Sequence, residues 1–343
     1  MKAIRFHEHG GPEVLKYEEA AEPEVRGNEV SVRVKACALN HLDLWVRGGL
    51  PGVTFPMPHI PGSDIAGEVA KIGADVTTVK VGQKVVLAPG VSCGKCAACV
   101  AGNDNKCRQF TNLGYLIDGG CAEFVKCPEV NCLTYPENLS WEEAAAVPLV
   151  FQTAWHMLVG RAELQPGEDV LVLGAGSGVG SAAIQIAKFF GARVISTAGT
   201  DEKLAKAREL GADFGINYKS QKIREEVRKI TGKRGVDVVF EHVGTATWEE
   251  SVASLALGGR LVTCGNTTGY DAKIDLRFLF SRQLSLLGSY MGKKSELQTV
   301  MKLVAAGRLK PVVDRVFPLA EAVAAHKYLE SSSQFGKVVL KVA

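Results

Sequence analysis

The sequence lacks the features that mark a membrane-spanning, secreted or nucleic-acid-binding protein. Its longest uncharged run, residues 170–187, contains glycines, serines and a glutamine, and so fits a strand, a loop and a helix start better than a membrane span. The first eight residues carry charges where a signal peptide needs an apolar core. With 40 basic and 37 acidic residues, a net charge of +3 provides no broad basic surface for nucleic acid or acidic lipid. We expect a cytoplasmic globular protein.

Length and cysteine content indicate the size and the redox setting of the protein. At roughly 150 residues per domain, 343 residues are expected to form two domains. An apolar fraction of 46% and a charged fraction of 22% are typical of a globular chain. Nine cysteines, an odd number, fit a reducing compartment better than a disulfide framework. Several of them are crowded between residues 93 and 107.

The amino-terminal half has short, alternating segments. In residues 30–36, Val30, Val32 and Val34 would share one face of a strand. Prolines spread between residues 51 and 89 argue against long helices in this half. We expect a β-rich domain over residues 1–150.

From about residue 150 onward the pattern alternates between strand and helix. Residues 169–173 form an apolar strand, and apolar residues from 179 to 190 then recur at helical spacing. Further strands are expected at 193–197, 214–218, 236–241, 260–264 and 284–287. This alternation predicts βαβ units and a parallel sheet, which we place in residues 151–288.

The last residues, 289–343, leave this alternation. A helix is expected near 320–329 and a strand at 337–341. Because strand and helix no longer alternate there, we expect this segment to return to the first domain.

A glycine loop follows the strand at 169–173. Glycines there let the backbone turn sharply and approach a pyrophosphate, while the following helix supplies free N–H groups and a positive dipole. The spacing is G-x-G-x-G-x-G rather than the strict G-x-G-x-x-G, so the prediction depends on the strand before the loop and the helix after it. The candidate dinucleotide-binding residues in the loop are Gly174, Gly176, Ser177, Gly178, Val179 and Gly180.

The end of the next strand bears on which dinucleotide is bound. NAD sites usually have an acidic residue there to hold the ribose 2′-hydroxyl, but residues 196–200 contain none. This favours NADP, with NAD still possible, and places a 2′-phosphate near Thr200, Lys203 or Tyr218. The alternative is that Thr200 only caps the following helix.

Four of the cysteines have the spacing of a metal site. Cys93, Cys96, Cys99 and Cys107 can close a tetrahedral zinc shell, which leaves no position for substrate. The first three match a bacterial ferredoxin, but that motif continues with three residues, a cysteine and a proline, and here Arg108 follows Cys107. We predict one structural zinc ion.

These features together resemble the medium-chain dehydrogenase/reductase superfamily, which contains zinc alcohol dehydrogenases and quinone oxidoreductases. The cysteine spacing, the Pro61-Gly62 turn, residues 119–124 and the nucleotide half carry the resemblance, which covers nearly the whole chain. It implies an α/β protein with a GroES-like β-rich catalytic domain and a Rossmann domain that has a doubly wound parallel sheet. It also implies an NAD(P)-dependent oxidoreductase.

The motif for a catalytic zinc ion is interrupted. By the resemblance, the first ligand cysteine corresponds to Cys37, Ser63 replaces the ligand histidine, and Leu149 lies where the remaining cysteine is expected. Serine is a weak zinc ligand. His41 and His59 could substitute, but neither lies at a ligand position of the family.

The replacing segments resemble the quinone oxidoreductase branch, which lacks the catalytic zinc and generally uses NADPH. The resemblance places Asn40 near the nicotinamide, beside Thr153 and the segment from Cys264 onward. The candidate catalytic residues are Asn40, His41, Asp43, Cys37 and Asp64, of which Asp43 and Asp64 could instead be buried structural carboxylates. The candidate cofactor contacts outside the glycine loop are Thr153, Thr197, Thr200, Lys203, Tyr218, Cys264 and Gly265.

Two enzymatic functions follow. The first is reduction of a quinone or an α,β-unsaturated carbonyl by NADPH, with His41, Tyr115 or solvent as the proton donor. The second is an alcohol dehydrogenase with an altered zinc site built on Cys37 and Asp64. A nucleotide-binding sensor or structural protein is a third, non-enzymatic alternative. Residues 284–287 resemble the segment through which family members pair, so a homodimer or homotetramer is expected.

Overall fold

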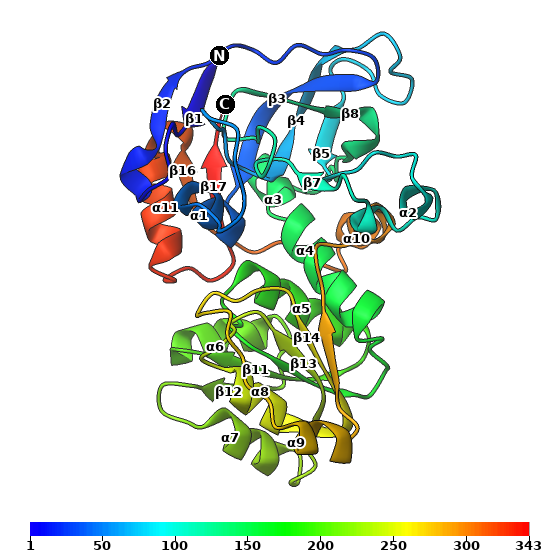
Figure 1. The fold of residues 1–343 in the computed structure, drawn as a ribbon, viewed down its shortest axis with the longest axis vertical. Coiled ribbons are helices and arrows are strands. Elements are labelled where there is room, and N and C mark those ends of the chain that lie inside the picture. The colour runs from blue at the N-terminus through cyan, green and yellow to red at the C-terminus, as the bar shows by residue number, and fades with distance from the viewer. Residues whose placement is uncertain (343) are drawn as a thin grey trace. The chain divides into compact units, whose positions relative to one another are not determined.

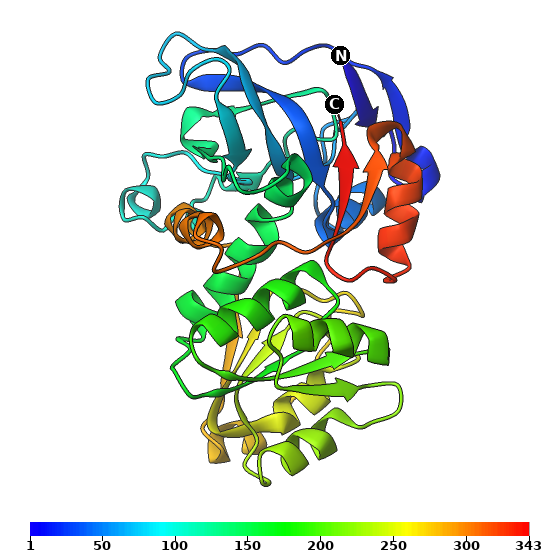
Figure 2. The ribbon, with the colours of Figure 1, turned by 180° about the vertical axis from the view of Figure 1, so that it is seen from behind.

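The computed structural model describes residues 1–342, which form two compact units. The β-rich unit contains residues 1–149 and the carboxyl-terminal segment from Lys293 onward, and the parallel-sheet unit contains Val150–Gly292. Strand β17 (Lys337–Lys341) pairs antiparallel with β3 (Glu29–Ala38), so the end of the chain lies beside its beginning (Figures 1 and 2). No helix within the described residues has the length and apolar content needed to cross a membrane.

The β-rich unit is organised around β3. Its main sheet has seven strands in the order β16-β17-β3-β4-β5-β9, with β8 also paired to β3. The predicted strand residues Val30, Val32 and Val34 are fully buried in it. The strands of this unit are β1 (Lys2–Arg5), β2 (Lys16–Glu19), β3, β4 (Asp64–Ile72), β5 (Lys84–Leu87), β6 (Gly90–Val91), β7 (Thr111–Asn112), β8 (Phe124–Pro128), β9 (Cys132–Thr134), β16 (Val313–Pro318) and β17.

Helices pack around this sheet. They are α1 (His41–Gly48), α2 (Ala97–Val100), α3 (Trp141–Ala145), α10 (Lys294–Ala305) and α11 (Ala322–Glu330). Helix α3 packs against the central strands β3 and β4, and α11 packs against β17. Helix α10 lies beside the loop that carries α2, although the two are distant in the sequence (Figure 1). The predicted helix near 320–329 is α11.

The parallel-sheet unit confirms the predicted βα alternation. Its six strands have the order β12-β11-β10-β13-β14-β15, and every neighbouring pair is parallel. They are β10 (Asp169–Val172), β11 (Arg193–Ala198), β12 (Phe214–Asn217), β13 (Val236–Glu241), β14 (Leu255–Thr263) and β15 (Ser285–Gly288). Strand β14 begins earlier than predicted, because Leu255 pairs with Val236 across an irregularity in the register. Strand β15 is an edge strand, and pairing of two chains through it stays a prediction.

Helix α4 (Pro148–Trp155), which continues into a wide helical turn at His156–Arg161, precedes β10. The helices that connect the strands are α5 (Gly178–Phe189), α6 (Asp201–Glu209), α7 (Ile223–Ile230), α8 (Trp248–Ser254) and α9 (Leu276–Ser281). From β10 the chain proceeds outward to β11 and β12, and then returns to the other side of β10 to form β13. The strand order therefore reverses between β10 and β13. In sheets of this kind, ligands bind outside the carboxyl ends of the strands at that reversal.

Candidate functional site

The four predicted metal cysteines converge in the loop between β6 and β7. Their sulfur atoms all lie within 4.8 Å of one another. Cys99 Sγ is 3.9 Å from Cys93 Sγ and 3.6 Å from Cys96 Sγ. A tetrahedral zinc shell with Zn–S bonds of about 2.3 Å places its sulfurs about 3.8 Å apart, so the cluster fits a zinc ion. In the described part of the chain, no other group of three or more His, Cys, Asp or Glu side chains is arranged to hold a metal.

Backbone hydrogen bonds in the cysteine loop favour the thiolate form of Cys93, which is the form that binds a metal cation. Backbone N–H groups of Lys95 and Cys96 lower the pKa of Cys93 to about 6, because they stabilise the thiolate.

The backbone N–H of Lys294 in α10 donates to Asp104 Oδ1 at 3.1 Å. Lys294 Nζ donates to Asn131 Oδ1 at 3.0 Å, and burial lowers the pKa of this lysine. The carboxyl-terminal segment thus anchors the loop, a contact that sequence reasoning missed.

A second polar cluster is buried in the β-rich unit around Asp64. Lys337 Nζ donates to Asp64 Oδ2 at 2.8 Å and to Asn40 Oδ1 at 2.5 Å. Asn40 Nδ2 donates to Asp64 Oδ2 at 3.0 Å, and the Leu149 N–H donates to Asp64 Oδ1 at 2.7 Å. All three side chains are buried. The carboxylate is therefore neutralised by a lysine and held by amide donors, an arrangement that makes a buried charge tolerable.

Asp43 connects this cluster to the turn before β4. Its Oδ2 accepts a hydrogen bond from the Asn40 N–H at 2.7 Å, which closes a capping box at the start of α1. Its Oδ1 accepts from the Gly62 N–H at 2.8 Å, and Gly62 has a φ of +103° that favours glycine. Burial raises the pKa of Asp43 to about 6. These contacts support the alternative in which Asp43 is a structural carboxylate.

The raised pKa of Asp43 predicts a pH-dependent difference between the wild type and Asp43→Asn. The folded protein holds the proton more tightly than the unfolded chain, so this contribution to stability is present below about pH 4 and is lost as the pH rises through about 6. We expect the unfolding free energy of the wild type, relative to the variant, to fall by about 2 kcal/mol between pH 4 and pH 7. Urea denaturation at several pH values measures it.

For Asp213→Asn, the difference in unfolding free energy between the wild type and the variant is expected to change with pH in the opposite direction. Its pKa is lowered by Lys188 and by the Val194 N–H, which outweigh the effect of partial burial. The wild type should therefore gain stability relative to that variant as the pH rises. If the unfolding free energies of the wild type and Asp43→Asn differ by the same amount at every pH, the raised pKa of Asp43 would be contradicted.

The structure does not bring Cys37 and Asp64 to one metal. In the pairing of β3 with β4, Cys37 is opposite Ile65 and Ala38 is opposite Asp64. Paired residues share a face of the sheet and neighbours alternate, so Cys37 and Asp64 point to opposite faces. Cys37 is fully buried, and its Sγ lies 3.8 Å from Cys121 Sγ.

The other residues considered for a catalytic metal are also dispersed. His59 is fully buried, with Nε2 3.3 Å from the Gly114 carbonyl and its ring edge-on to Phe6. His41, the first residue of α1, has its ring edge-on to Trp45. The Ser63 hydroxyl is buried and finds no hydrogen-bond partner within residues 1–342.

The glycine loop has the geometry expected of a phosphate-binding turn. Gly174 has a φ of +58°, and its N–H donates to Thr197 Oγ1 at 3.1 Å. Ser177 caps α5 and accepts a hydrogen bond from the Gly180 N–H at 2.9 Å. A Cβ on Gly180 would lie 2.3 Å from the Gly174 carbonyl oxygen. The tight turn at the start of α5 therefore requires glycine, and it fits a dinucleotide diphosphate.

The tip of β11 bears on the choice between NADP and NAD. Thr200 caps α6 through a 3.3 Å hydrogen bond from the Lys203 N–H, as the alternative interpretation expected. A Cβ on Gly199 would lie 2.6 Å from the Tyr218 hydroxyl and 3.3 Å from Lys219 Cε. Tyr218 and Lys219 therefore lie over the strand tip. Lys219 was missed, although its position next to Tyr218 was a usable signal.

The carboxyl ends of β13 and β14 complete this edge of the sheet. The Cys264 N–H donates to the Glu241 carbonyl at 3.3 Å, and burial raises the pKa of the Cys264 thiol to about 12. A Cβ on Gly265 would lie 3.2 Å from the carbonyl oxygen of His242, a buried residue that sequence reasoning missed. Thr153, in α4, is buried, and its hydroxyl has no hydrogen-bond partner in the described chain.

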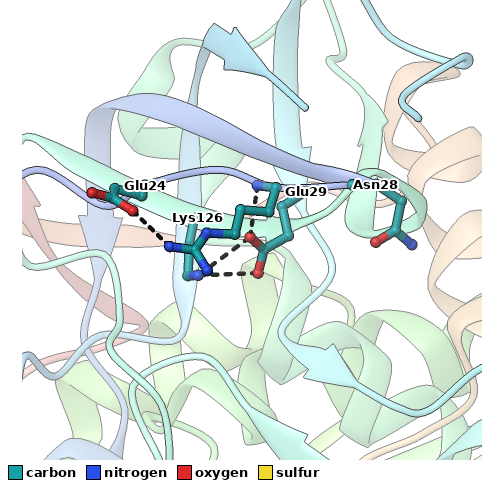
Figure 3. Close-up of a pocket in the computed structure, with 6 residues that line it drawn as sticks. Glu24, Asn28, Glu29 and Lys126 are labelled. Carbon is teal, nitrogen blue, oxygen red and sulfur yellow. Dashed lines mark hydrogen bonds and ion pairs between the residues drawn. The ribbon is translucent and has the colours of Figure 1, made fainter. Parts of the chain in front are cut away.

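A surface hollow in the β-rich unit lies apart from these groups (Figure 3). Its charged side chains pair with one another: Arg26 is 3.0 Å from Glu24, and Lys126 is 3.1 Å from Glu29. The charges in the hollow therefore neutralise one another, and we assign no ligand to it.

Comparison with known proteins agrees with both units. The family model of the alcohol dehydrogenase GroES-like domain matches residues 26–137, and that of the zinc-binding dehydrogenases matches residues 178–306. A solved structure described as an NAD-dependent alcohol dehydrogenase is 48% identical, with a TM-score of 0.97 and full coverage of both chains.

Curated relatives carry several activities. The crotonyl-CoA carboxylase/reductase of Cereibacter sphaeroides is 34% identical over 94% of this chain and 83% of its own. Quinone oxidoreductase 1 of Escherichia coli is 32% identical over 98% of both chains. The relatives therefore agree on an oxidoreductase but differ in substrate.

Proposed function

Because the chain belongs to the medium-chain dehydrogenase/reductase superfamily and is an NAD(P)-dependent oxidoreductase, we propose that it reduces a quinone or an α,β-unsaturated carbonyl without a catalytic metal. The observation that carries the proposal is that protein groups already bind the Asp64 carboxylate, which would otherwise be a ligand for a catalytic zinc ion together with Cys37. Its carboxylate is bound by Lys337, Asn40 and the Leu149 N–H, while Cys37 points to the other face of the sheet. Similarity to a quinone oxidoreductase and to a crotonyl-CoA reductase supports it.

The chain's own groups have separable roles in this proposal. The nicotinamide cofactor, when bound, supplies a hydride to the electrophilic carbon of the substrate. The glycine loop would hold the diphosphate through N–H groups at the start of α5 other than those of Gly174 and Gly180, which already donate to Thr197 Oγ1 and Ser177 Oγ. Lys337 fixes both Asp64 and the Asn40 amide, so these polar groups are rigid before substrate binds. The proton would come from His41, Tyr115 or solvent; the rings of His41 and Tyr115 pack edge-on against Trp45 and Phe55, respectively.

NADP is the proposed cofactor. The β11 tip carries no acidic side chain to hold a ribose 2′-hydroxyl, and Tyr218 and Lys219 lie over it as donors for a 2′-phosphate. One zinc ion per chain, in the cysteine quartet, would hold the loop and take no part in the reaction, since four thiolates close its shell.

Parallel assays on protein of known metal content test the reaction. We expect NADPH oxidation with a quinone or an enone, little turnover with an aldehyde, and one zinc ion per chain. Two zinc ions per chain, together with alcohol oxidation that a chelator abolishes while the fold persists, would reject the proposal.

Binding measurements with paired variants test the cofactor. Replacing Tyr218 by Phe or Lys219 by Met should weaken NADPH binding roughly tenfold and leave NADH binding unchanged, because a hydrogen bond to a charged group contributes about 1.5–3 kcal/mol. Lys222→Met is the control, since Lys222 pairs with Glu225 at 3.3 Å. Equal losses for both dinucleotides would argue against a 2′-phosphate site.

A second candidate function is alcohol dehydrogenase activity with NAD. The observation in its favour is the 48% identity to a structure described as an NAD-dependent alcohol dehydrogenase. The same assays distinguish the two, because an alcohol dehydrogenase reduces NAD with an alcohol and has no need of an enone.

A further inference from the structure

His242 directly follows β13, where the strand order of the parallel sheet reverses, and its ring lies against the glycine loop. We propose that His242 holds the phosphate loop and takes up a proton when a dinucleotide binds there, so that binding and protonation are coupled. The inference rests on the dinucleotide site of the proposed function. It concerns affinity and pH, and it applies to NAD and NADP alike.

The ring of His242 joins β13 to the glycine loop. Its Nε2 lies 2.9 Å from the Leu173 carbonyl, at the end of β10, and 3.3 Å from Ser177 Oγ. A Cβ on Gly174 would lie 3.0 Å from His242 Cε1, so the loop passes directly over the imidazole. Phe240, in β13, lies edge-on to the ring with centroids 6.0 Å apart. The histidine therefore supports the loop from beneath.

The contact with Ser177 extends this support to the helix. Ser177 Oγ accepts a hydrogen bond from the Gly180 N–H and caps α5. The N–H groups at this helix start are the donors available to a diphosphate. A diphosphate there adds negative charge next to the imidazole, and a nearby negative charge stabilises the protonated form of histidine.

One nitrogen of a protonated His242 already has an acceptor in place. Nε2 lies 2.9 Å from the Leu173 carbonyl, to which its N–H donates. In the free protein, burial lowers the pKa of His242, so the ring is neutral at neutral pH. A proton added at Nδ1 therefore leaves the hydrogen bond from Nε2 to Leu173 in place.

The neighbouring titratable groups do not replace His242 in this role. Glu241 is fully buried, and its carboxylate accepts hydrogen bonds from Val243 N–H at 2.6 Å and from Ser251 Oγ at 2.5 Å. Burial raises the pKa of Cys264, the residue after β14, to about 12, so this thiol stays neutral. The loop from residue 174 to residue 180 has only Gly, Ala, Ser and Val side chains. The proton uptake is therefore expected at His242.

The contacts of His242 predict that the affinity for the dinucleotide increases as the pH falls. The pKa of His242 is low in the free protein and rises when negative charge binds beside it. Between the two pKa values, each binding event takes a proton from the buffer, and affinity increases by up to about tenfold for each unit that the pH falls.

Isothermal titration calorimetry with NADH, in buffers of different ionisation enthalpy between pH 5.5 and 8, tests the proposal. NADH is the probe because it has no 2′-phosphate, a group that itself titrates near about pH 6. The wild type should take up close to one proton per NADH bound at the lower pH values. Binding of NADH with no proton uptake across this range would overturn the proposal, and this result needs no variant.

Three variants test whether His242 is the group that takes up the proton. His242→Gln should bind NADH roughly tenfold more weakly and lose both the proton uptake and the pH slope of the Kd. Ser177→Ala should weaken binding but keep the uptake, because it retains the imidazole. His326→Gln, which removes a buried histidine of the β-rich unit, should change neither.

Undiminished uptake in His242→Gln would overturn the proposal, as would loss of uptake in His326→Gln. Circular dichroism establishes that each variant is folded. Failure of quinone and enone turnover, with the calorimetric result intact, would reject the proposed reaction and leave the role of His242 standing.

Discussion

Replacing Cys107 by serine is expected to release zinc from the chain and to lower the melting temperature by roughly 6–20 °C. Cys107 is the buried member of the quartet, and its loss leaves three thiolates that no longer close a tetrahedral shell. Removing a structural metal should destabilise the β-rich unit by about 3–5 kcal/mol, and each kcal/mol corresponds to about 2–4 °C at this size. Scanning calorimetry and metal analysis on the same samples measure both effects.

Cys132→Ser is the matched control for the zinc prediction. Cys132 is a half-buried free cysteine at the start of β9 and is not part of the quartet. This variant should keep one zinc ion per chain and nearly the wild-type melting temperature. A Cys107→Ser protein with full zinc content and unchanged melting would contradict the metal site. Iron and visible absorbance in the wild type would instead indicate an iron–sulfur cluster.

Replacing Lys337 by methionine should destabilise the β-rich unit by about 3–5 kcal/mol, because it leaves the Asp64 carboxylate buried without a cation. It also removes the donor to Asn40 Oδ1. Urea denaturation measures the change. Lys341→Met is the control: Lys341 belongs to the same strand, but its side chain is mostly exposed and 4.0 Å from Glu142, so the loss should stay below about 0.5 kcal/mol.

The pairing of Lys337 with Asp64 can be separated from a general loss of packing by a double-mutant cycle. Asp64→Asn in the Lys337→Met background removes the uncompensated charge, so the double variant should be more stable than Lys337→Met alone. If Lys337→Met melts like the wild type, the ion pair carries no stabilising role. If the two losses simply add, the two side chains act independently.

Several elements of the fold were predictable because they depend on local patterns. The strand predicted at 236–241 is β13, and the strand predicted at 337–341 is β17. A strand buried on both faces is a continuous apolar run, and its ends coincide with turn residues. The cysteine loop was predictable for a similar reason, since a short loop keeps its ligands close whatever the rest of the chain does.

The relation between Cys37 and Asp64 was not predictable in this way. Side chains alternate along each strand, but which face of β3 matches which face of β4 depends on the register between them. That register places the two side chains on opposite faces. A one-residue shift would have placed them together, and neither strand's own sequence determines the shift.

The sequence by itself therefore determined the local chemistry of this protein: four thiols at metal spacing, a glycine turn between a strand and a helix, and a strand tip without an acid. Only the tertiary structure decided the partners of its buried polar groups. Lys337 meets Asp64 across 273 residues, and His242 meets Leu173 across 69. A buried charge or imidazole must find a partner once water is excluded, and which residue becomes that partner depends on which strands pack side by side.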